Sequence, residues 1–114
     1  MHPHFVTTKK GDIYSFELIN SDGEVLLRSN LFRTKSECYD EITQVKSSVA
    51  SSTHFEKRKE SSGQFTFVLK NKYQEIIGHS NPFWSSSSRD YAMMTVRREA
   101  SDANIEEQSH VLGF

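Results

Sequence analysis

Cys38 is the residue best suited to covalent chemistry in this chain. It is the only cysteine among 114 residues, so no intrachain disulfide is possible. A cysteine beside a histidine can act as a nucleophile with its base. Cys38, however, falls on the apolar stripe of an expected helix, and the counterpart of Cys38 in an internal repeat is Arg89. We therefore interpret Cys38 as a packed structural thiol.

The five histidines offer little for a metal ion. His2 and His4 are the closest pair, but they lie in a terminal segment without a third ligand of fixed geometry. His79 falls in an expected strand with Arg28 as its counterpart, which favours a polar surface position. The sequence contains no glycine-rich phosphate loop, paired-carboxylate arrangement or serine triad motif. We expect no catalytic, cofactor or metal site, and an enzyme is the least favoured of three hypotheses.

A second hypothesis is weak nucleic-acid binding through a basic edge. Such an edge would be formed by Lys57, Arg58, Lys59, Lys70 and Lys72. Phe65 and Phe67 nearby could stack on bases. Glu56 and Glu60 flank the basic triplet, however, and the two rings alternate as core residues do. A solvated edge strand is the interpretation we favour.

The link at residues 81–84 is the strongest candidate for an interaction surface. It contains Asn81, Pro82, Phe83 and Trp84, and Trp84 corresponds to Arg33 in the repeat. A position that accepts arginine favours exposure to water, and exposed aromatic residues are enriched at contact hot spots. The alternative is that Trp84 covers the edge of the core. The candidate surface comprises Trp84, Pro82, Asn81 and Arg33.

These residues are positioned by a structure that the chain encodes twice. The segment Tyr14–Ser29 returns as Phe65–Ser80 at a shift of 51 residues, and the shift continues through the helix that follows. The identical pairs are Phe16/Phe67, Leu18/Leu69, Asn20/Asn71, Glu24/Glu75, Ser29/Ser80, Asn30/Asn81, Phe32/Phe83, Ser36/Ser87 and Val45/Val96. A tandem duplication explains this pattern better than chance.

Each repeat reads as two or three strands followed by one helix. Apolar residues alternate with polar ones from Tyr14 to Leu18, as expected for a strand with one buried face. Turn residues at 20–23 then predict a hairpin. Thr34 and Glu37 form a capping box, and serines 85–88 offer caps in the second repeat. We predict an α+β fold in which tandem β-β-α units form one antiparallel sheet with two helices on one face.

Length and charge indicate a single, ordinary globular domain. We expect residues 1–114 to form one domain of two repeats, about 5–53 and 54–105, with a tail at 106–114 that either adds an edge strand or is partly frayed. The 14 basic and 15 acidic residues give a net charge of −1, so charge favours neither nucleic acid nor a membrane as partner. No apolar run reaches the ~20 residues of a membrane span. Without a secretory signal, we expect a cytoplasmic protein, as a monomer or weak homodimer.

The repeat pattern resembles the YegP-like family of small bacterial proteins. The resemblance rests on Tyr14–Leu18, Gly23–Leu26 and Ile42–Lys46, together with their counterparts in the second repeat. It implies a repeated β-β-α fold without established activity or catalytic residues. The chain departs from the family at Glu41 and Ala92, where members usually carry a helical glycine. We therefore expect a non-enzymatic structural or macromolecular-interaction module whose partner is unknown.

Overall fold

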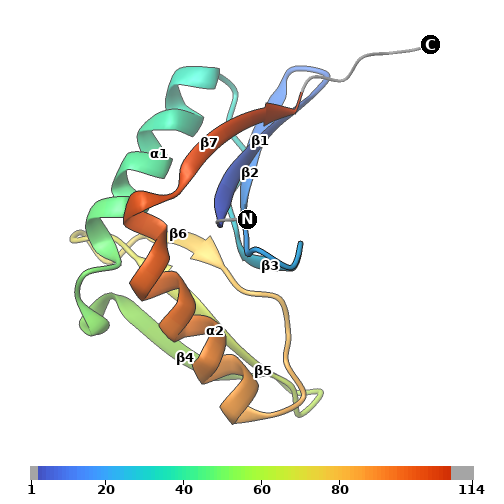
Figure 1. The fold of residues 1–114 in the computed structure, drawn as a ribbon, viewed down its shortest axis with the longest axis vertical. Helices are drawn as coiled ribbons and strands as arrows, with labels where there is room; N and C mark the ends of the chain where they lie inside the picture. The colour runs from blue at the N-terminus through green and yellow to red at the C-terminus, as the bar shows by residue number, and fades with distance from the viewer. Residues whose placement is uncertain (1–2, 109–114) are drawn as a thin grey trace.

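The structure, a computed structural model, describes residues 3–108. The first repeat contains β1 (His4–Lys10), β2 (Ile13–Ile19), β3 (Val25–Arg28) and α1 (Lys35–Ser48). The second contains β4 (Phe55–Lys59), β5 (Phe65–Lys70), β6 (Ile76–His79) and α2 (Ser86–Glu99), and β7 (Asn104–Gln108) follows. Short 3-10 turns at Ser52–His54 and Ala100–Asp102 connect each helix to the next strand. This order confirms the predicted duplication (Figure 1).

The two β-hairpins between the second and third strands use the same turn chemistry. In the first, Asn20 Oδ1 accepts hydrogen bonds from the backbone N–H groups of Asp22 and Glu24, both at 2.9 Å. Asn71 repeats this arrangement in the second hairpin. Gly23 has φ 84°, whereas its counterpart Gln74 has φ 65°, a region that side chains other than glycine rarely adopt. The second turn is therefore the less favourable of the two.

Both helices begin at the caps that the sequence predicts. Thr34 Oγ1 accepts from the N–H of Glu37, and the Glu37 carboxylate accepts from the N–H of Thr34, which completes the capping box. Ser85 Oγ accepts from the N–H of Ser88 at 3.1 Å and caps α2. Each cap satisfies backbone donors that have no partner within the helix.

The seven strands form one sheet in the order β4-β5-β6-β3-β2-β1-β7. Neighbours are antiparallel except β1 and β7, which are parallel, so the predicted antiparallel sheet gains one parallel edge. β7 spans the expected boundary at 105/106 and forms one edge of the sheet, which is one of the two alternatives for the tail. Residues 109–114 of that tail lie outside the described residues. Residues of β1 correspond to residues of β4 at a shift of 50 rather than 51. The reason is that the turn between β4 and β5 is one residue longer than the turn between β1 and β2.

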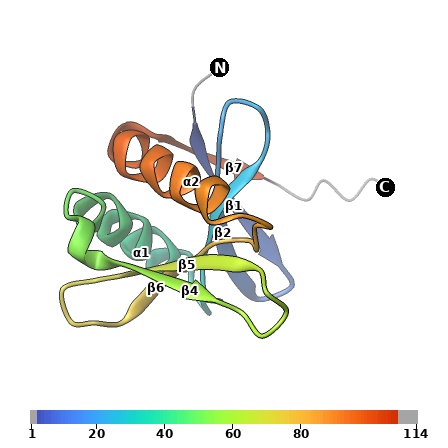
Figure 2. The same cartoon turned by 90° about the horizontal axis from the view of Figure 1, so that it is seen from below.

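The repeats interlock through their helices, which lie on the same face of the strongly twisted sheet (Figure 2). α1 packs on β2 of its own repeat and on β5 and β6 of the other, while α2 packs on β5 and β3. The helix residues Ile42, Val45 and Val96 are buried in the core, and Met93 is half-buried against it. The buried strand residues of this core are Phe5, Phe16, Leu18, Leu26, Leu27, Phe67, Leu69 and Ile77.

Candidate functional site

Trp84 is held on a backbone that is fixed on both sides. The preceding residue, Phe83, exchanges two backbone hydrogen bonds with Phe65, at 2.7 and 2.8 Å. The following residue, Ser85, caps α2. Trp84 itself is 80% exposed, so it does not cover the edge of the core. An aromatic side chain on a rigid backbone can be bound by a partner at a low entropic cost.

Of the other residues predicted for this surface, Asn81 and Pro82 lie beside Trp84, whereas Arg33 lies far from it. Pro82 is exposed, and the half-buried Asn81 accepts a hydrogen bond from Arg28 at 3.3 Å. Arg33 is also exposed, but it precedes α1, whereas Trp84 precedes α2. The two helices start at opposite ends of the molecule (Figure 1). The expected surface therefore does not include Arg33, because equivalent links of the two repeats point to opposite ends.

A groove of about 630 Å³ begins beside this link and runs between α2 and the β2–β3 turn. Pro82, Phe83 and Tyr91 contribute apolar surface, and Asn20 and Glu24 contribute polar groups. Tyr91 is 67% exposed. We define the Trp84 surface as Asn81, Pro82, Trp84 and Tyr91 with this groove. Sequence reasoning missed Tyr91 as a surface residue, although the polar residues around it in the first half of α2 indicate exposure.

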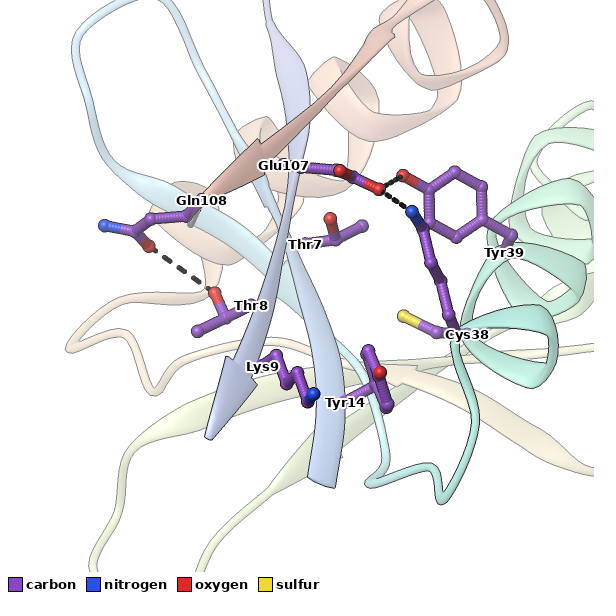
Figure 3. A pocket seen from close by; sticks show the side chains of 9 residues that line it. Thr7, Thr8, Lys9, Tyr14, Cys38, Tyr39, Glu107 and Gln108 are labelled. Atoms are coloured by element: carbon purple, nitrogen blue, oxygen red, sulfur yellow. Dashed lines mark hydrogen bonds and ion pairs between the residues drawn. The ribbon is translucent and has the colours of Figure 1, made fainter. Parts of the chain in front are cut away.

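A separate pocket of about 360 Å³ lies between β1, β7 and α1 (Figure 3). Its lining consists of Thr7, Thr8 and Lys9 of β1, Tyr14 of β2, Lys35, Cys38 and Tyr39 of α1, and Glu107 and Gln108 of β7. Cys38 points from α1 toward β1 and is fully buried. We call this cavity the Cys38 pocket. Sequence reasoning missed it because the pairing of β7 with β1 joins residues about one hundred positions apart.

Glu107 is the centre of polar contacts in the Cys38 pocket. It forms an ion pair with Lys35 and accepts a hydrogen bond from the Tyr39 hydroxyl at 2.8 Å. Lys35 and Tyr39 stabilise the carboxylate and hold the pKa of Glu107 below its usual value. The same contact raises the pKa of Lys35, whereas burial, followed by the bond to Glu107, raises the pKa of Tyr39.

Cys38 itself is poorly suited to nucleophilic chemistry. Burial, followed by the negative charge of Glu41, raises the pKa of its thiol to about 11. A reactive cysteine needs the opposite environment, because the thiolate is the nucleophile. This geometry agrees with a packed structural thiol.

The predicted basic residues are engaged with groups of the same chain. Lys57 lies 3.4 Å from Asp90, and Glu56 pairs with both Arg58 and Lys70, at 2.5 and 2.7 Å. Lys59 and Lys72 lie over the rings of Phe65 and Tyr73 at 5.5 and 5.2 Å. β4 is an edge strand, as expected. These contacts compete with phosphate groups for the same cations.

The three histidines within residues 3–108 are dispersed, and His2 of the predicted terminal pair lies outside the described residues. His4 lies near Glu106 on the outer side of β1, His54 bonds to the Ser48 carbonyl, and His79 is half-buried where the repeats join. Within residues 3–108, no group of three or more histidine, cysteine or acidic residues could hold a metal ion. In the same range, no helix is both long and apolar enough to cross a membrane.

The comparisons with known proteins agree with the two-repeat architecture. The chain matches a family described as domain of unknown function (DUF1508) twice, over residues 10–56 and 60–107. A UPF0339 protein in the ptx operon 5′ region of Stutzerimonas stutzeri is 28% identical over 98 residues, 86% of this chain and 88% of that protein. UPF0339 protein YegP of Escherichia coli K12 is 27% identical over 96 residues, 84% of this chain and 87% of that protein.

Two solved structures are similar to this one. The solution NMR structure of YegP from E. coli, described as a protein of unknown function, has a TM-score of 0.88 and 27% identity, and the match covers 96% of each chain. A UPF0339 protein from Shewanella oneidensis has a TM-score of 0.89 over both whole chains, and its 24% identity supports the fold alone. The resemblance found in the sequence is thus confirmed, and the chain belongs to the DUF1508 family, whose function is unknown.

Proposed function

We propose that this chain is a non-enzymatic, cytoplasmic interaction module that binds another protein through the Trp84 surface. The observation that carries the proposal is the 80% exposure of Trp84 on a backbone fixed by Phe83 and Ser85. Tryptophan is strongly enriched among residues that dominate binding energy. Because most of the Trp84 side chain faces solvent, a partner can cover it without breaking contacts inside this protein.

The groove beside Trp84 supports a protein as the partner. A groove with the apolar wall of Pro82, Phe83 and Tyr91 and the polar groups of Asn20 and Glu24 can take a peptide segment while a partner covers Trp84. Interfaces of this kind combine an apolar centre with a polar rim.

The test compares Trp84→Ala with Arg33→Ala, which truncates the equivalent residue of the first repeat. Tagged proteins are used for capture from a native lysate, and excess untagged wild-type protein identifies specific partners by competition. We expect Trp84→Ala to lose these partners while its thermal midpoint stays unchanged and Arg33→Ala retains them. Equal capture by Trp84→Ala and the wild type would overturn the proposal.

Weak nucleic-acid binding through the basic edge is the other hypothesis that the experiment must separate. Phosphate contacts make affinity fall steeply with salt. Retention of the specific partners after nuclease treatment and at raised salt supports the protein interface. Loss of all partners under both conditions would favour the basic edge instead.

A further inference from the structure

The Cys38 pocket has a counterpart in the second repeat that is filled by an arginine of the chain itself. Arg89 occupies on α2 the position of Cys38 on α1, and it is only 8% exposed. Its guanidinium carbon lies 5.3 Å from the centroid of the Phe65 ring, and its Nε donates to Asp90 at 3.0 Å. Its Nη1 donates to the Arg58 carbonyl of β4 at 3.4 Å. The second repeat thus contains a guanidinium site made of a ring, a carboxylate and a backbone carbonyl.

Each partner of Arg89 has its counterpart in the lining of the Cys38 pocket. Phe65 corresponds to Tyr14, Asp90 to Tyr39 and Arg58 to Thr8. Because cysteine is much shorter than arginine, the volume that Arg89 fills in the second repeat is left open in the first. The resulting cavity of about 360 Å³ falls in the size range of small-ligand pockets.

The first repeat supplies its carboxylate from a different element. Tyr39 replaces Asp90, and β7, which pairs with β1, brings Glu107 into the pocket (Figure 3). An ionised carboxylate has about four acceptor positions, so its bonds to Tyr39 and Lys35 leave acceptor capacity for a ligand. The ring and the carboxylate of the second repeat's site therefore both have equivalents here.

Two exposed lysines show that these equivalents attract cations. Lys35 pairs with Glu107, and Lys9 Nζ lies 5.7 Å from the centroid of the Tyr14 ring. Ammonium groups are strongly hydrated, whereas a guanidinium is planar, more weakly hydrated, and able to stack on a ring and donate two parallel hydrogen bonds. A guanidinium can therefore displace both lysines, which remain solvated when they leave.

We propose that the Cys38 pocket binds a guanidinium group presented from outside the chain, stacked on Tyr14 and hydrogen-bonded to Glu107. The ligand class is an arginine side chain of a partner protein. Trp84 and Tyr91 do not line this pocket. Arginine binding in the Cys38 pocket and partner binding at the Trp84 surface can therefore be tested independently.

The test is an NMR titration of the full chain with N-acetyl-arginine amide, with N-acetyl-lysine amide and acetate as control probes. We expect saturable shifts of the backbone amides of Thr8, Cys38 and Glu107, with a dissociation constant on the order of 1 mM. The lysine probe should bind at least about 10-fold more weakly, because it cannot stack and donate at the same time. Absence of saturable shifts with the arginine probe, or preferential binding of acetate, would overturn the proposal.

Variants locate the bound group. Cys38→Arg introduces the side chain of the second repeat, so it should fill the pocket and abolish binding. Glu107→Gln tests the same contact without altering the buried thiol, and it should weaken binding by at least about 10-fold, the loss of a charge-assisted hydrogen bond. Glu106→Gln is the matched control, because Glu106 neighbours His4 rather than the pocket. Equal affinity of Glu107→Gln and Glu106→Gln would show that the probe binds elsewhere.

Discussion

Arg28 and His79 occupy equivalent positions of the two repeats and lie opposite each other where β3 meets β6. Arg28 Nη1 donates to Asn81 Oδ1 at 3.3 Å, and His79 Nε2 bonds to Asn30 Oδ1 at 3.1 Å. The two asparagines are equivalent as well, so each repeat binds the other through the same pair of positions. Within the described chain this register pair is the only one between β3 and β6, so these side chains and the shared core hold the junction.

The junction predicts a dependence of stability on pH. Burial, followed by the positive charges of Arg58 and Arg28, lowers the pKa of His79 below its usual value. The unfolded chain therefore takes up this proton at a higher pH than the folded chain, and acidification favours unfolding. Stability contributed by neutral His79 is fully present above pH ~6.5 and is lost as the pH falls through the lower pKa of the folded state.

Replacement of His79 by glutamine should remove this contribution to the pH dependence. We expect the free energy of unfolding, measured in urea at intervals from pH 8 to pH 5, to fall less steeply for His79→Gln than for the wild type. The comparison isolates His79, because all other titrating groups are common to both proteins. Parallel curves for the two proteins would contradict a neutral, half-buried His79.

A second prediction concerns the packing of α1 on the sheet. Ile42 is 1% exposed and belongs to the core formed by both repeats. Ile42→Ala should lower the free energy of unfolding by about 2 to 5 kcal/mol, through lost burial and the cavity left behind. Thr43→Ala on the exposed side of the same helix should change it by less than about 0.5 kcal/mol. Equal denaturation midpoints for the two variants would reject this packing.

The sequence predicts the features of this fold that depend on local chemistry. Alternation at Phe16 and Leu18 identifies β2, and the pair Thr34 and Glu37 identifies the start of α1. The repeat then transfers each assignment to the second half of the chain. The arginine at the position equivalent to Trp84 favours exposure over a place at the core edge, and the Trp84 side chain is 80% exposed.

The features that the sequence does not predict depend on contacts between distant residues. β7 has one partly buried apolar residue, Ile105. It pairs with β1, and no local sequence pattern indicates that β1 has a free edge for another strand. Arginine is normally a surface residue. Arg89 is buried because its guanidinium packs on the Phe65 ring and donates a hydrogen bond to the Arg58 carbonyl of the edge strand β4. The Cys38 pocket depends on both features. β7 supplies Glu107, and the cysteine at the position equivalent to Arg89 leaves the cavity open.

A third prediction is that Cys38 reacts slowly in the native protein. The thiol is fully buried and its pKa is raised to about 11, so only about one molecule in a thousand carries a thiolate at pH 8. A thiol reagent should label the native protein at least about 100-fold more slowly than the protein in urea, because reaction requires both opening and ionisation. Labelling at similar rates in the two states would reopen the nucleophile hypothesis.

The last prediction tests whether the chain is one domain of two interdependent repeats. α1 packs on β6 of the second repeat, and α2 packs on β3 of the first, so a single repeat cannot cover its own apolar sheet face. A fragment of residues 1–53 is also shorter than the ~60 residues at which a domain becomes marginally stable. We expect fragments 1–53 and 54–114 to be largely unfolded alone by circular dichroism and NMR, and to recover the dispersed spectrum of the full chain when mixed. Ile77→Asp in the second fragment is the control, because Ile77 is 1% exposed and a carboxylate there would lack a partner in the core that α1 covers. That variant should not complement, whereas a dispersed spectrum from residues 1–53 alone would show that the first repeat is an independent domain.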